Sequence, residues 1–107
     1  MKYKYGEFTE NQIHEYKTIL HSKIHWLLIY QESNYPLLSQ YFSSLQFHIA
    51  GLAELIDSPQ IIELADLVEC ARMEYESEKF NRFKYRKLIL DAHSIIDLLP
   101  EVGDENV

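Results

Sequence analysis

Apolar residues recur at steps of three and four along nearly the whole chain, and this spacing constrains the fold more than any other feature of the sequence. Such steps keep side chains on one face of an α-helix, whereas a half-buried strand requires strict alternation, which no segment shows. The first stretch includes Leu20 and Leu27 and meets no helix-breaking residue before Ser33-Asn34. We therefore expect a helix at about residues 10–32.

The same spacing continues in three further segments, which prolines and turn residues delimit. Pro36 suits the first turn of a helix, and Ser58-Pro59 can provide the cap and the first residue of the next one. Asn81 is a short break, and Pro100 stops the last segment. These signals predict helices at about residues 36–56, 59–80 and 82–99.

Four amphipathic helices with short connections predict an all-α fold, a small antiparallel four-helix bundle. The chain has 107 residues with only three glycines and three prolines, which fits one ordinary globular domain. We expect a single domain over residues 1–100 and a disordered tail over residues 101–107. Cys70 is the only cysteine, so an internal disulfide and a cysteine-based zinc site within one chain are excluded.

The charge and the absence of long apolar runs indicate where the protein works. A formal net charge of -7 disfavours broad charge-driven binding to nucleic acid or to anionic lipid. No run approaches the roughly 18 apolar residues of a membrane span, and the N-terminus lacks the apolar stretch of a signal peptide. We expect a cytoplasmic protein without a membrane segment.

The basic residues gather in one short segment. Five of the ten lysines and arginines fall in residues 79–87, directly after an acidic helix, so we expect surface ion pairs between the last two helices. Phe83 and Tyr85 alternate with these cations, a pattern also found on nucleic-acid surfaces, but either ring can equally anchor the core.

Three of the five histidines, His14, His21 and His25, lie on one line of the first predicted helix together with Glu32. The four-residue spacing of His21 and His25 lets two imidazoles share a divalent metal ion. Further ligands would have to come from other helices, where the alternatives are His48, Glu69, Asp91 and His93. The simpler interpretation is a set of half-exposed polar side chains bordering the core, with no cofactor.

Arg86 and His93 are seven residues apart within YRKLILDAH and share one helical face. This arrangement is similar to the arginine-then-histidine motif of HEPN-type ribonucleases, which are also small all-α proteins. The resemblance implies a histidine that moves protons and an arginine that steadies the phosphate. Lys87 departs from that family's pattern, which has a smaller polar residue after the arginine.

Several large apolar side chains fall off the main apolar faces of their helices, which indicates a second buried surface such as a homodimer interface. We expect a non-catalytic protein that acts through protein association, as a homodimer or as a regulatory or accessory subunit. The alternatives are a metal-binding protein that uses His21 and His25 and a HEPN-like ribonuclease. The predicted interface residues are Trp26, Tyr30, Tyr35 and Phe47.

Overall fold

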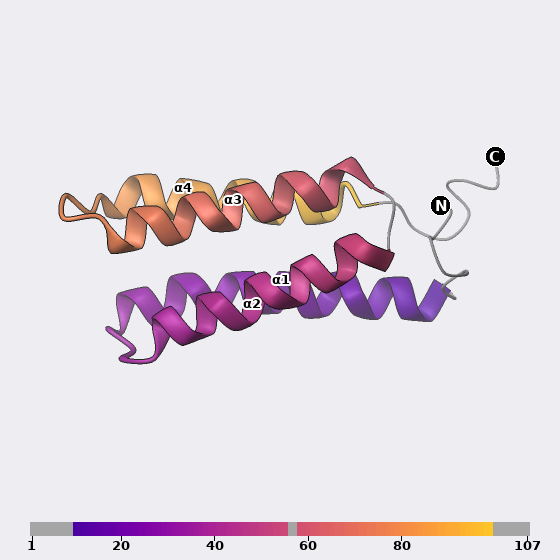
Figure 1. The fold of residues 1–107 in the computed structure, drawn as a ribbon, viewed down its shortest axis with the longest axis horizontal. Coiled ribbons are helices and arrows are strands. Elements are labelled where there is room, and N and C mark those ends of the chain that lie inside the picture. Colours follow the sequence, from indigo (N-terminus) through magenta and orange to yellow (C-terminus); the bar gives the residue numbers. More distant parts are fainter. Residues whose placement is uncertain (1–9, 56–57, 100–107) are drawn as a thin grey trace.

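The computed structural model describes residues 10–55 and 58–99, and within them the side chains of residues 15–54 and 58–99. The chain forms four helices and, in the residues described, no strand. The helices are α1 (Glu10–Glu32), α2 (Leu38–Leu55), α3 (Pro59–Glu76) and α4 (Arg82–Asp97). Figure 1 shows α1 and α2 lying side by side below α3 and α4, with successive helices antiparallel. The predicted all-α fold and four-helix bundle are confirmed.

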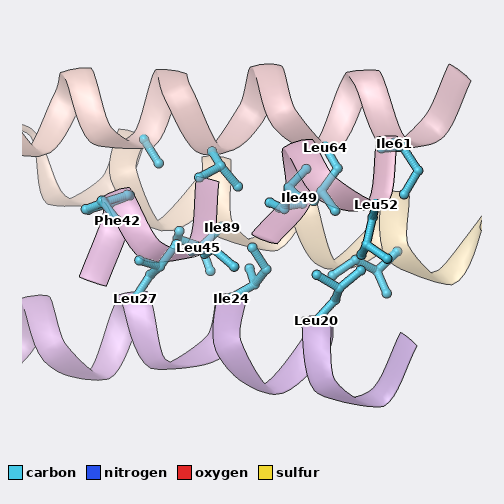
Figure 2. Close-up of a cluster of buried hydrophobic side chains, with 14 of the residues drawn as sticks. Leu20, Ile24, Leu27, Phe42, Leu45, Ile49, Leu52, Ile61, Leu64 and Ile89 are labelled. Atoms are coloured by element: carbon cyan, nitrogen blue, oxygen red, sulfur yellow. The ribbon is translucent and has the colours of Figure 1, made fainter. Parts of the chain in front are cut away.

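Each helix packs against two neighbours around one core. α1 contacts α2 and α4, and α3 contacts the same two helices. None of the helices described is long and apolar enough to cross a membrane. The buried core side chains include Leu20, Ile24 and Leu27 of α1, Phe42, Leu45, Ile49 and Leu52 of α2, Ile61 and Leu64 of α3, and Ile89 of α4 (Figure 2).

α1 ends in a Schellman motif. Asn34 has a φ of 57°, the left-handed conformation that asparagine tolerates better than most residues. Its N–H donates to the carbonyl of Gln31 at 3.2 Å, and the N–H of Tyr35 donates to the carbonyl of Tyr30 at 2.9 Å. The two tyrosine rings stack with centroids 4.3 Å apart, which is the apolar contact that accompanies this motif.

Three helices differ from the prediction at their ends, and α4 ends at Asp97 where residue 99 was predicted. α2 begins at Leu38, because Pro36 lies in the turn before the helix and not in its first turn. α3 ends at Glu76, where Ser77 becomes extended and its Oγ accepts a hydrogen bond from the N–H of Lys79 at 3.1 Å. This turn stops the helix before the predicted end.

α4 begins where Asn81 caps it. The side-chain oxygen of Asn81 accepts hydrogen bonds from the N–H groups of Phe83 and Lys84, at 2.9 and 3.1 Å. The sequence did not decide whether Phe83 or Tyr85 anchors the core. Tyr85 is buried in the core, and its hydroxyl donates a hydrogen bond to the carbonyl of Leu27 at 2.8 Å. Phe83 is 72% exposed, so it does not anchor the core.

Only one of the expected ion pairs between α3 and α4 forms among the residues described. Lys84 of α4 pairs with the buried Glu74 of α3 at 3.8 Å. The other pairs there lie within single helices, and Arg72 bonds both Glu69 and Glu76 as its spacing allows. The predicted tail over residues 101–107 lies outside the described residues.

Candidate functional site

Three histidines meet in the groove between α1 and α4. The ring of His93 stacks on that of His21, with centroids 4.1 Å apart and planes 16° apart. It also lies 5.8 Å from the ring of His25, one turn further along α1. The predicted line of histidines therefore faces α4, and the third imidazole comes from that helix. The side chain of His14 lies outside the described part of the chain.

The four candidates for a third metal ligand lie in different places in the structure. His48 accepts a hydrogen bond from Lys23 at 3.3 Å, and Glu69 bonds Gln46 of α2 at 2.6 Å, so both are engaged away from the cluster. Asp91 pairs with Lys87 at 2.9 Å. Only His93 is placed against His21 and His25.

The histidine rings stack and do not converge on one point. Within residues 15–54 and 58–99, no three side chains of His, Cys, Asp or Glu are arranged to hold a metal ion. Coordination by His21, His25 and His93 would require their rings to turn, because each ligand nitrogen has to point at the metal. Metal binding by His21 and His25 stays a prediction.

The surroundings of His93 favour its neutral form. Its Nε2 atom is buried and has no hydrogen-bond partner. Burial, followed by the charges that His21 and His25 carry when protonated, lowers the pKa of His93 below its ordinary value of 6.5, although Asp97 and the backbone of His21 act in the opposite direction. A neutral imidazole is the form that can accept a proton.

The same groove contains the residues of the ribonuclease-like motif. Arg86 and His93 are two turns apart, about 10 Å along the axis of α4. Arg86 lines a hollow together with Gln31 and Glu32 of α1, whereas His93 contacts α1 nearer its middle. The two residues therefore lie along one groove, and ribonuclease activity stays a prediction.

The predicted interface aromatics divide into two groups. Tyr30 and Tyr35 are half-buried and stack on each other, and Tyr30 also meets Tyr41 edge-on at 5.1 Å. Trp26 packs on Tyr30 at 5.1 Å but remains 42% exposed. Phe47 is 83% exposed, the most open of the large apolar side chains described. Phe47 and Trp26 are thus available to a partner.

Phe47 lies among small residues on the outer side of α2. The positions three and four residues before and after it are Ser43, Ser44, Ala50 and Gly51, and all four are exposed. These positions are its neighbours on a helix surface. We call Phe47 and these four residues the α2 patch. The spacing of these small residues around Phe47 can be read from the sequence, but the exposure of Phe47 can be seen only in the structure.

Gly51 has no close neighbour within its own chain. A Cβ atom built at this position meets no atom of the described residues within 4 Å. A glycine inside a helix can reflect close approach of another helix or simple tolerance, and the open space here excludes close approach by a described helix of the same chain. Tolerance remains, as does an approach by another molecule.

Comparisons with known proteins give no independent indication of function. No protein-family model, curated protein or solved structure matches the chain. The site must therefore be interpreted from its own geometry.

Proposed function

We propose that the protein acts through protein association and that its first partner is a second copy of the same chain, bound through the α2 patch. The observation that carries the proposal is the surface of α2, where an open phenylalanine is surrounded by four small residues. A fully buried phenylalanine removes about 150–250 Å² from water, so its exposure in the isolated chain is unfavourable.

The shape of the patch suits contact between identical surfaces. In a two-fold dimer the same patch meets itself, so Phe47 of each copy can lie over the small residues of the other. Ser44 and Gly51 present little side chain, which lets two helices approach closely. Small residues lie both before and after Phe47 along the helix, so the Phe47 ring of the other copy finds open surface on either side.

The charge distribution supports the same surface. α2 contains a single acidic or basic residue, Glu54, whereas α3 and α4 carry many. Charged residues are depleted in the centres of protein interfaces. Two copies that each carry a net charge of -7 meet with least repulsion through their least charged helix.

Exposed apolar side chains beside the patch can extend the contact. Leu37, just before α2, is 50% exposed, and Ile19 and Trp26 of α1 are each 42% exposed. Tyr30, four residues after Trp26, contacts Tyr41 of α2, so this side of α1 borders α2. Stable dimers bury about 800 Å² per partner, which requires flanking residues of this kind.

The direct test introduces one charge into the patch. Phe47→Glu should weaken the dimer at least tenfold, because burying one large apolar side chain contributes about 1.5–3 kcal/mol and every 1.4 kcal/mol corresponds to about a tenfold change in Kd. Sedimentation equilibrium over a concentration series measures the change. Leu90→Glu is the matched control, because Leu90 is 48% exposed on α4, a helix that carries no residue of the α2 patch.

A second variant separates association from folding. Gly51→Leu should leave the monomer as stable as before or more stable, since leucine favours helix and the space around this glycine is open. It should nevertheless weaken the dimer, because the new side chain occupies the space of the partner helix. Equal dimerisation of the wild type, Phe47→Glu and Gly51→Leu would contradict the proposal.

A further inference from the structure

The end of the α1–α4 groove beyond the histidines contains a hollow of about 490 Å³. This volume lies within the range of about 300–1,000 Å³ that is usual for small-molecule sites. One wall is the end of α1 and the turn after it, and the other is the beginning of α4. We call it the arginine hollow; its polar and aromatic lining is Gln31, Glu32, Asn34, Arg82, Phe83 and Arg86.

Two arginines on its α4 wall have no acidic partner. Arg82 and Arg86 are one turn apart and exposed, and no carboxylate of the described residues lies within ion-pair distance of either. The lysines of the same segment differ, because Lys84 pairs with Glu74 and Lys87 pairs with Asp91. The two arginine side chains are therefore free to bind an anion.

The position of these arginines is unfavourable for the helix itself. A helix N-terminus carries a partial positive charge that favours acidic residues, yet the first turn of α4 contains none and begins with Arg82. Two cations one turn apart also repel each other. A bound anion would relieve both effects, since guanidinium groups bind phosphate oxygens with paired hydrogen bonds.

Phe83 adds a flat apolar surface beside these cations. Its ring is 72% exposed, and the guanidinium carbon of Arg82 lies 5.1 Å from the ring centroid. An aromatic ring next to cations offers a stacking surface to a planar base, at about 1–3 kcal/mol per base in nucleic-acid-binding proteins. The amides of Gln31 and Asn34 on the opposite wall can both donate and accept hydrogen bonds.

We propose that the arginine hollow binds a single nucleotide, with its phosphate on Arg82 and Arg86 and its base stacked on Phe83. One phosphorylated unit fits better than a nucleic-acid strand, because the chain has a net charge of -7 and Glu32 lies in the wall of the hollow. The site is separate from the α2 patch, so it does not depend on dimerisation.

The experiment titrates the protein with adenosine 5′-monophosphate and follows backbone amide resonances by NMR. Saturable shifts should concentrate on the residues that line the arginine hollow. Arg82→Ala and Arg86→Ala should each weaken binding about tenfold, the factor that corresponds to losing one charge-assisted hydrogen bond. Lys87→Ala, which removes a cation already paired with Asp91, should leave the affinity unchanged.

Two further titrations identify what is recognised. Inorganic phosphate should bind more weakly than the nucleotide, and Phe83→Leu should reduce nucleotide affinity while leaving phosphate affinity unchanged. The proposal is overturned if nucleotide binding does not reach saturation by about 10 mM, because a Kd above that concentration is too weak to be useful. Nucleotide binding by Arg82→Ala and Arg86→Ala as tight as that of the wild type would also overturn it. Much tighter binding of a short single-stranded oligonucleotide would overturn it too, because it would identify a nucleic-acid surface instead.

Discussion

At the scale of single residues, His93 is the described histidine whose surroundings depart most from those of an exposed side chain. Its buried Nε2 atom has no partner, and its ring packs against two other imidazoles. Burial is the largest cause of its lowered pKa. In the folded protein the neutral form is therefore favoured, whereas the unfolded chain takes up a proton at the ordinary value of 6.5.

This difference predicts that acid destabilises the fold through His93. Because its folded-state pKa is depressed, its contribution to stability is complete above the unfolded pKa and is lost as the pH falls through the folded pKa. Urea unfolding of the wild type should give a falling free energy of unfolding from about pH 7.5 to about pH 5. His93→Phe, which keeps a stacking ring but cannot titrate, should flatten that slope.

The control for this measurement is Ser94→Ala, an exposed neighbour of His93 on α4, which should keep the wild-type slope. Some slope should remain in His93→Phe, because burial followed by the charge of Lys23 also lowers the pKa of His48. An unchanged slope in His93→Phe would show that His93 does not contribute.

The sequence could predict the α1 side of the histidine cluster, His21 and His25, but not the α4 side, His93. The spacing of His21 and His25 fixes them on one side of α1 whatever the rest of the chain does. The choice of His93 over His48, Glu69 and Asp91 depends on how α4 is rotated and on which helix lies beside α1. Those are properties of packing, which local spacing does not specify.

At the scale of the elements, the apolar spacing predicted the four helices, but it did not predict some of their ends. Ser58 and Asn81 are both plausible N-cap residues and both have extended backbones. Only Asn81 caps with its side chain, whereas the hydroxyl of Ser58 donates to Gln60 Oε1 at 2.7 Å. The predicted side-chain cap at Ser58 is therefore wrong, because a nearby amide competes for the hydroxyl.

The two caps give a matched pair of substitutions. Asn81→Ala should lower the free energy of unfolding by about 1 kcal/mol, since it leaves two N–H groups of α4 without their acceptor. Ser58→Ala should cost less, because no helix N–H loses a partner. Equilibrium urea unfolding of both variants measures the difference, and an equal or reversed order would contradict this account of the caps.

At the scale of the whole molecule, charge and exposed apolar surface are distributed unevenly. α3 and α4 carry most of the charged residues of the bundle, while the outer side of α2 presents serine, alanine and glycine around Phe47. An isolated monomer gains nothing from exposing this ring. A second copy would cover it, and the arginine hollow on the α1–α4 side would stay open to a ligand.

The most direct test of this account is native mass spectrometry of the untagged wild-type protein over a series of concentrations. We expect a complex of twice the chain mass of 12.7 kDa, which becomes the main species as the concentration rises. Phe47→Glu should shift the mixture to the single-chain mass under the same conditions. A wild-type protein that stays monomeric at every concentration would contradict the central claim.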